Sequence, residues 1–287
     1  MSTVKVASGT DRSRPSPATV RSTIGAGAMR MSGMLTSCAG VAVLLLLWVI
    51  ATTAFKIPDY LLPSPIAVIR RASLEWNILL SQTSYTLIEI LAGFLASVLI
   101  GVPTAFVVVL SRPVERLVLP MVVASQAIPK VAIAPMLVVW LGFGLLPKIV
   151  ISFLIGFFPV LVSTITGLKS VETEMIDLVR SMGASTTTTM LRVRLPSALP
   201  QIFSGLKMAI ALSVVGAIVG EFVGADRGLG YLLLTATGAL DGTLVWAALL
   251  VLIGLGIVLF QIVTMVERAA IRWHVSVRVN DQQTFTS

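Results

Sequence analysis

The chain has 287 residues, of which 56% are hydrophobic and only 12% are charged. Soluble domains average roughly 45–50% and about 25%, so this composition excludes an ordinary soluble protein and indicates an integral membrane protein. The net charge of +8 does not indicate nucleic-acid binding, because the basic residues are spread among loops, and the lone Cys38 excludes both a disulfide framework and a thiolate metal site.

The chain begins with a polar stretch, residues 1–34, that is rich in Ser, Thr, Arg, Pro and Gly. We expect a disordered cytoplasmic tail there. A signal peptide is the alternative for the apolar run that follows, but the leader before that run is unusually long. An uncleaved first helix is the preferred interpretation.

The predicted fold is an all-α polytopic membrane protein with about six transmembrane helices. Each needs about 20 apolar residues to cross the hydrocarbon. Pro58, Pro63 and Pro65 break any helix early in 56–83, so this segment is expected to be an external loop with a short surface helix after Ser64. A permease-type transmembrane domain would cover 35–275, followed by a cytoplasmic tail at 276–287. The expected spans are 36–55, 84–110, 119–141, 148–168, 201–223 and 245–266.

The distribution of Lys and Arg predicts the orientation of these spans. With the N-terminus inside, fourteen basic residues fall on the inner side and five, including Lys148, on the outer side. Cytoplasmic loops carry the excess of basic residues in membrane proteins. We therefore expect both termini in the cytoplasm, and also the polar loop at 169–200.

That loop contains a motif with a specific spacing. In DLVRSMGASTTTTMLRVRLPSALP, at 177–200, Gly183 stands six positions after Asp177, and Val193, Leu195 and Pro196 follow. The spacing resembles that of the cytoplasmic coupling loop of bacterial ABC-type importer permeases, although the consensus there begins Glu-Ala-Ala. The resemblance implies a coupling contact with an ATPase for nine residues: Asp177, Leu178, Val179, Arg180, Gly183, Ala184, Ser185, Leu195 and Pro196.

The physical pattern of the loop agrees with this function. Met175, Leu178, Val179 and Met182 recur at helical intervals and predict a short helix with an apolar face, and Gly183 predicts a backbone bend after it. An ordinary amphipathic connector would explain the periodicity but not the spacing from Gly to Leu-Pro.

The resemblance extends over about residues 57–275. It includes LPSP at 62–65, QAIPKVAIAP at 126–135, WLGFG at 140–144, GEFVGA at 220–225 and GLGY at 228–231. The chain is similar to the nitrate/sulfonate/taurine-type importer permeases. This similarity implies a type I permease bundle with a cytoplasmic coupling helix, in a bacterial inner membrane.

Ionisable residues inside predicted spans need partners or a wet cavity, because burial in hydrocarbon is costly. Lys130 lies near the middle of the expected third span, with Gln126 one turn away, while Glu89 and Glu221 lie in other spans. We expect Lys130 to line or support the translocation path and one of the two glutamates to neutralise it. A structural ion pair between helices is the equally weighted alternative.

Catalytic and cofactor sites are not expected in this chain. It has no Gly-x4-Gly-Lys phosphate loop, and its one histidine, His274, excludes a His-Glu-x-x-His zinc site or a Ser-His-Asp set. The expectation is a transporter subunit with no catalytic, metal or cofactor site, whose ATP is bound by a separate polypeptide. A secondary carrier or channel is the alternative of another class, but it leaves the loop motif without a purpose.

The resemblance also implies partners. They are two ABC ATPase subunits, a second permease copy that forms a homodimer, membrane lipid, and a periplasmic or lipid-anchored solute-binding protein. The implied cargo is a small solute of the nitrate, sulfonate or taurine type. Glu89 and the 126–135 stretch look closer to members that carry pyrimidine-type vitamin precursors or riboflavin, so that class is the alternative.

Overall fold

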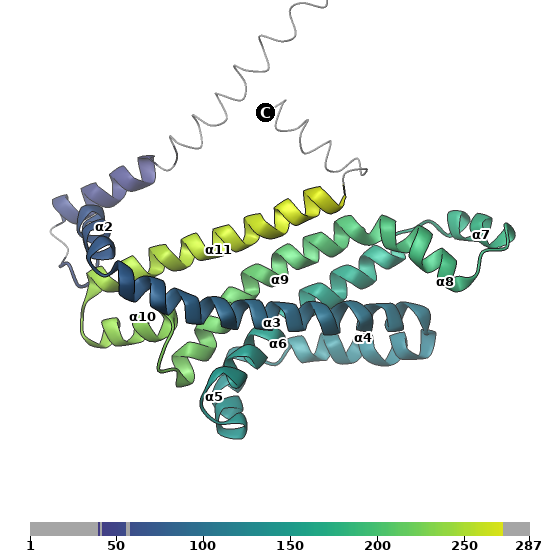
Figure 1. Cartoon of the computed structure of the whole chain (residues 1–287), viewed down its shortest axis with the longest axis horizontal. Helices are drawn as coiled ribbons and strands as arrows, with labels where there is room; N and C mark the ends of the chain where they lie inside the picture. Colours follow the sequence, from purple (N-terminus) through teal and green to yellow (C-terminus); the bar gives the residue numbers. More distant parts are fainter. Residues whose placement is uncertain (1–39, 41, 56–57, 272–287) are drawn as a thin grey trace, which may run out of the picture. The chain divides into compact units, whose positions relative to one another are not determined.

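Helix α6 (Leu145–Lys169) packs between α3 (Trp76–Leu110) and α9 (Leu195–Gly224) in the computed structural model (Figure 1). The structure describes residues 40, 42–55 and 58–271, which are helical apart from turns and short connections. The chain divides into two units, and of the first, residues 1–44 and 278–287, only 40 and 42–44 are described. The packing and the sites below concern the described residues of the second unit, which covers residues 45–277. The predicted tails lie outside the described residues.

Small residues let these three helices approach closely. A Cβ atom on Gly216 of α9 would lie 2.6 Å from the Cα of Ser152 on α6, and one on Gly220 would lie 2.9 Å from the Cα of Lys148. On α3, a Cβ on Gly93 would lie 2.3 Å from the Oγ of Ser152. Close approach of small residues is the usual basis of helix packing in membranes.

The described residues contain four helices that are long and apolar enough to cross a membrane, or five if one bent pair is counted as a span. Five of the six predicted spans lie on these helices, with the third on the bent pair. The first, 36–55, lies partly outside the described residues, which show an apolar helix at Ala42–Ala54. The four long helices are α3, α6, the rod Thr186–Gly224 and α11 (Gly242–Ala270).

The segment of the expected third span, 119–141, is not one straight helix. Two helices, α4 (Arg112–Gln126) and α5 (Lys130–Leu141), meet there at an angle of 96°. Pro129, the residue before α5, has φ −69° and ψ 99°, and this ψ lies outside the helical region. A proline also disfavours helical backbone angles at the residue before it, here Ile128. The chain therefore turns at 127–129.

Two helices extend beyond the predicted spans. Helix α3 begins at Trp76, inside the expected loop, and its polar residues remain helical; Thr83 donates to the Leu79 carbonyl at 2.6 Å. The fifth span begins far before 201, because α8 (Thr186–Thr189), a π-helical turn (Met190–Arg194) and α9 form one rod. The short helix expected after Ser64 is present as α2 (Pro65–Leu74), capped by the Ser64 hydroxyl.

The π-helical turn lies directly before Pro196. Proline has no N–H for an ordinary helical bond, and its ring collides with the preceding turn. The Leu195 N–H bonds instead to the Met190 carbonyl, five residues back, so the wider turn accommodates the proline without ending the rod.

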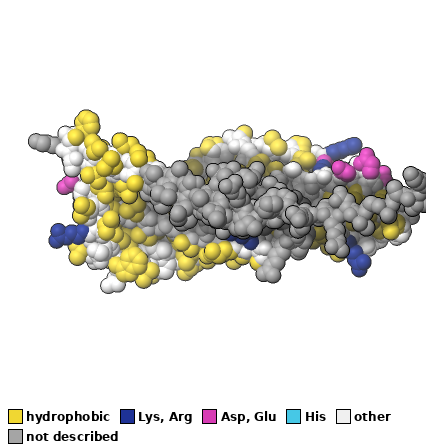
Figure 2. Space-filling view, turned by 90° about the horizontal axis from the view of Figure 1, so that it is seen from above, with side chains coloured by type: hydrophobic (Ala, Val, Ile, Leu, Met, Phe, Trp, Pro, Cys, Tyr) yellow, Lys and Arg dark blue, Asp and Glu magenta, His cyan; other side chains and the backbone are white. Residues whose placement is uncertain are grey.

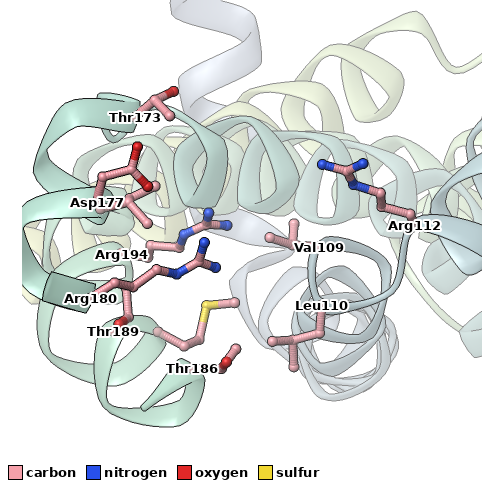
Figure 3. A pocket seen from close by; sticks show the side chains of 11 residues that line it. Val109, Leu110, Arg112, Thr173, Asp177, Arg180, Thr186, Thr189 and Arg194 are labelled. Atoms are coloured by element: carbon pink, nitrogen blue, oxygen red, sulfur yellow. The ribbon is translucent and has the colours of Figure 1, made fainter. Parts of the chain in front are cut away.

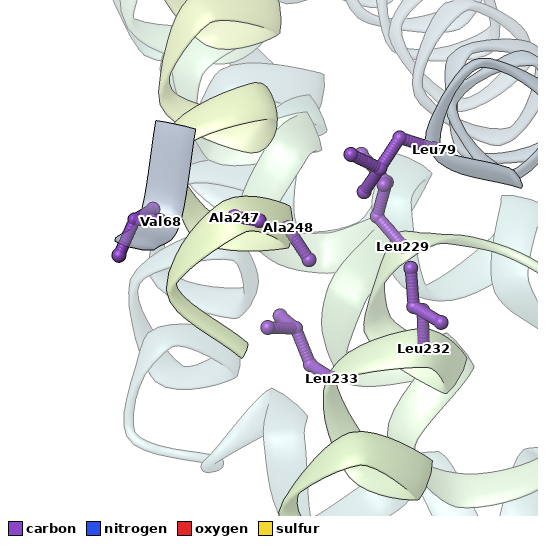
Figure 4. Close-up of a cluster of buried hydrophobic side chains, with 7 residues drawn as sticks. All are labelled: Val68, Leu79, Leu229, Leu232, Leu233, Ala247 and Ala248. Atoms are coloured by element: carbon purple, nitrogen blue, oxygen red, sulfur yellow. The ribbon is translucent and has the colours of Figure 1, made fainter. Parts of the chain in front are cut away.

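A hydrophobic cluster joins α2, α3, α10 (Leu229–Gly238) and α11 (Figure 4). Trp48 and Trp246 lie beside this cluster with ring centroids 5.0 Å apart. The Trp48 indole donates to the Pro63 carbonyl at 3.1 Å. The buried members of the cluster are Val68, Leu79, Leu229, Leu232, Leu233, Ala247 and Ala248.

Large apolar side chains remain exposed over much of the described part. Val139 is 81% exposed and Phe143 is 84% exposed. Hydrophobic side chains cover wide areas of the surface visible in Figure 2, while acidic and basic side chains lie mainly toward its two ends. Such a surface suits a lipid environment and contacts with other subunits.

Candidate functional site

The predicted coupling segment forms a short helix, a tight turn and the start of a long rod. Helix α7 (Thr173–Ser181) follows α6 after a short connection, and the rod begins at Thr186. The predicted helix and bend are therefore present in the structure. Their contact with an ATPase stays a prediction.

Gly183 fixes the end of α7. Its φ of +85° lies in the left-handed region, which glycine adopts at little cost. The Gly183 N–H bonds to the Arg180 carbonyl at 2.9 Å, and the Ala184 N–H bonds to the Val179 carbonyl at 3.2 Å. This pair of bonds is a Schellman motif, which satisfies carbonyl groups that the helix end leaves free.

The next residues start the rod. The Ser185 hydroxyl accepts a hydrogen bond from the Thr188 N–H at 3.1 Å, which caps the new helix. Leu195 and Pro196, which the motif placed at the end of the loop, lie half-buried inside this rod.

Helix α7 is held to the protein by one apolar residue and presents others outward. Ile176 is 7% exposed, whereas Leu178 is 57% exposed and Met182 is 79% exposed. Asp177 and Arg180 are also exposed, and Val179 is half-buried. The predicted apolar face therefore largely avoids the interior of the unit and is free to contact another protein.

The second predicted group, the ionisable residues of the spans, is arranged differently from the prediction. Glu89 pairs with Lys148, whose Nζ lies 2.8 Å from Oε1, and both side chains are buried. Lys130 is half-buried and donates to the Gln126 side chain at 3.0 Å. The expectation that a glutamate neutralises Lys130 is therefore wrong, because Lys148 takes that partner.

Glu221 organises the loop between α9 and α10. Its carboxylate accepts hydrogen bonds from the Thr86 hydroxyl at 2.7 Å and from the Gly230 N–H. Thr86 in turn accepts a bond from the Leu229 N–H at 2.8 Å. A Cβ on Gly228, which has φ +113°, would lie 2.0 Å from Oε1 of Glu221, so only glycine fits.

Sequence reasoning missed Lys148, Thr86 and Gln82, whose amide oxygen accepts from the Gly228 N–H at 2.6 Å. Lys148 was counted with the outer basic residues because it is the first residue of the expected fourth span, 148–168, whereas the helix begins at Leu145. Its four-residue spacing from Ser152, a residue that also faces the interior, was the available signal.

A cavity of about 380 Å³ adjoins the Glu89–Lys148 pair. Glu89 Oε2 is buried and accepts no hydrogen bond from the described residues. At the same cavity, the Arg227 guanidinium lies 5.2 Å from the centre of the Tyr85 ring. The cavity therefore offers a guanidinium cation and an aromatic face, while the Glu89 carboxylate lies buried beside it.

The comparisons with known proteins agree with the motif. The family model described as "Binding-protein-dependent transport system inner membrane component" matches residues 97–272, more than half of the chain. A probable ABC transporter permease protein of Haemophilus influenzae is 40% identical over 220 residues, 77% of this chain and 90% of the relative.

Relatives with named cargo fall into two groups. The formylaminopyrimidine transport permease ThiX of Halalkalibacterium halodurans is 36% identical, over 80% of this chain and 92% of the relative. The riboflavin transport permease RibX of Chloroflexus aurantiacus is 35% identical, over 81% and 88%. The taurine transport permease TauC of Escherichia coli is more distant, 29% identical over 82% and 88%.

An inward-facing structure of the MetNI methionine ABC transporter has a chain of the same fold. The TM-score is 0.60 with 22% identity, covering 68% of this chain and 97% of that chain. The fold, the loop motif and the family match agree. The protein belongs to the binding-protein-dependent transport system inner membrane components, the multi-pass membrane permeases of ABC importers.

Proposed function

We propose that this chain forms the translocation path of an ATP-driven importer and that α7 transmits movement from a separate ATPase. The observation that carries the proposal is the outward apolar face of α7, formed by Met175, Leu178 and Met182, beside the fixed turn at Gly183. A partner seated on this face would displace α6 and the rod together, because both flank α7 through short connections.

The proposed assembly places α7 in the cytoplasm, as the count of basic residues favours. Two ATPase subunits would contact two permease copies, and a periplasmic or lipid-anchored binding protein would deliver the solute on the other side. The exposed apolar side chains of α5, including Met136, Val139 and Trp140, support contact with a second copy of the permease.

Co-purification with the ATPase tests the coupling step. Replacing Gly183 by Val forces a β-branched residue to φ +85°, and we expect the bound ATPase to be lost. Gly254→Val is the matched control, since a Cβ there meets no atom within 4 Å and no left-handed φ is required. Full transport in the absence of any ATPase would overturn the proposal in favour of a secondary carrier.

For the solute, we propose a nitrogen heteroaromatic compound of the pyrimidine or flavin kind. Support comes from the permeases that are 36% and 35% identical, whose names specify such cargo, against 29% for the taurine permease. The cavity next to Glu89 and Lys148 is also lined by Tyr85, whose aromatic ring suits stacking of a flat solute.

ATPase activity of the reconstituted complex with its binding protein tests the cargo. We expect stimulation by formylaminopyrimidine or riboflavin and none by taurine, other sulfonates or nitrate. Stimulation by a sulfonate alone would reject the heteroaromatic cargo and leave the coupling proposal intact.

A further inference from the structure

A second cavity, of about 330 Å³, lies behind the coupling helix rather than near the Glu89–Lys148 pair. Its walls come from four elements: the end of α3, the start of α4, helix α7 and the first turns of the rod (Figure 3). None of its residues was predicted to bind a small ligand.

Three arginines contribute to this cavity from different elements. Arg180 of α7 and Arg194 of the rod extend into it from one wall, and Arg112 of α4 faces them across the space (Figure 3). Asp177 is the one acidic residue in the lining, so three positive charges and one negative charge leave two positive charges.

These charges are not neutralised within the described part of the chain. Arg71, Lys148, Lys169 and Lys207 all have a carboxylate partner within 4 Å there, whereas the three arginines of this cavity have none. Like charges that line one space repel one another, and an anion between them removes that cost. The described residues thus leave this cavity ready for an anion.

The chemistry of the lining specifies the kind of anion. A guanidinium presents paired N–H donors that match two oxygens of a phosphate group. The hydroxyl groups of Thr173 and Thr186 add two donors at the wall. Val109, Leu110, Ile176 and Met190 add apolar surface to the lining, which suits carbon groups attached to a phosphate, and Thr189 is its remaining member.

We propose that this cavity binds a phosphate-bearing anion, held between Arg112, Arg180 and Arg194. Such an anion would join α4, α7 and the rod, three elements that otherwise approach one another with like charges. Two sources share this chemistry, namely the headgroup of an anionic phospholipid and free phosphate. The proposal does not depend on the identity of the transported solute.

Binding to the purified full-length permease tests the proposal, without requiring the ATPase. The probes are inorganic phosphate and dihexanoyl phosphatidylglycerol below its micelle concentration, each titrated calorimetrically. We expect at least one probe to bind, and we expect Arg180→Gln and Arg194→Gln each to weaken binding at least about tenfold, because each removes a charge-assisted contact.

Arg192→Gln is the matched control, because Arg192 is exposed in the same turn as Arg194 but does not line the cavity. Its affinity should stay within about twofold of the original. Arg112→Gln, on a separate element, supplies an independent variant if a change in α7 or the rod prevents folding.

The two probes distinguish the sources. Binding of phosphatidylglycerol at least about tenfold tighter than inorganic phosphate supports the lipid headgroup, and the reverse supports free phosphate. Equal affinity in the original, the glutamine variants and the control overturns the proposal, as does the absence of binding by both probes. Loss of the ATPase in Arg194→Gln with unchanged anion binding also overturns it, because an acidic partner would then be the occupant.

Discussion

Lys148 and Glu89 form an ion pair inside the helix bundle, with 2.8 Å between Nζ and Oε1 and side-chain exposures of 6% and 1%. The pair connects α6 to α3 at a level where Glu221 of α9 is also buried. Removing one partner of a buried pair leaves an uncompensated charge, which typically costs about 3–5 kcal/mol, much more than replacing both partners.

We therefore predict that Lys148→Met strongly lowers the thermal stability and cellular abundance of the permease. The double variant Lys148→Met/Glu89→Gln should regain much of the loss, because both charges of the pair are then absent. Melting of the purified proteins in detergent measures the difference. Lys130→Met is the matched control, since Lys130 contacts a neutral amide, and equal melting of the two single variants would contradict the prediction.

Lys130→Met also tests its predicted place in the translocation path. Normal abundance with lost transport would support that place, whereas lost abundance alone would reject it. This test does not involve an ion pair, because Lys130 has no carboxylate partner within 4 Å among the described residues. A stability effect would therefore not be confused with the loss of an ion pair.

Sequence reasoning reached local features more easily than tertiary ones. Gly183 and the preceding helix could be predicted because their signals, an apolar period and a glycine, lie within a few residues of each other. The pairing of Lys148 with Glu89 could not, because the residues are 59 positions apart and hydropathy does not specify which faces meet. The count of basic residues also treated Lys148 as an outer residue at the edge of a span rather than as a member of a buried pair.

The prolines also show that local sequence does not determine tertiary structure. Pro103, Pro120, Pro135 and Pro159 lie inside helices, whereas Pro129 marks a 96° break. Pro129 differs from the others in its polar neighbours Gln126 and Lys130, but a polar flank alone does not specify a 96° turn. Neighbouring helices decide whether the freed carbonyl groups can be accommodated.

Close packing of α9 against α6 gives a second stability prediction. Gly216→Ala places a Cβ 2.6 Å from the Cα of Ser152, and a backbone atom has little freedom to move away. Overpacking of this kind costs about 1–3 kcal/mol. We expect lower melting for this variant and an unchanged value for Gly254→Ala, whose Cβ meets no atom within 4 Å; equal melting would show that the helices can separate freely.

Asp241 lies outside the predicted spans, and its lowered pKa leads us to predict that the stability of the fold depends on pH. Burial alone would raise the pKa of Asp241, but hydrogen bonds from Thr243 and the Leu244 N–H, together with Arg71, lower it below its ordinary value. A group whose pKa is lower in the folded state stabilises the fold above its unfolded pKa of about 3.9, and this contribution is lost as the pH falls through the folded value.

The melting difference between the original protein and Asp241→Asn should therefore be constant from about pH 7 to pH 5 and shrink below about pH 4. The comparison between the two proteins cancels acid effects from other groups. A difference that grows on acidification would mean that the pKa of Asp241 is raised in the folded state.

Helix α7 has a buried apolar residue and exposed apolar residues, so substitutions can test its role in folding separately from its role in coupling. Ile176 is buried against the unit, so Ile176→Ala should destabilise the permease itself, by about 2–5 kcal/mol. Leu178 points outward, so Leu178→Ser should leave melting nearly unchanged and weaken co-purification of the ATPase, provided that the exposed face is the docking surface. If Leu178→Ser retained the ATPase fully while Ile176→Ala lost it, α7 would contribute through its position alone, and its exposed face would not be the contact.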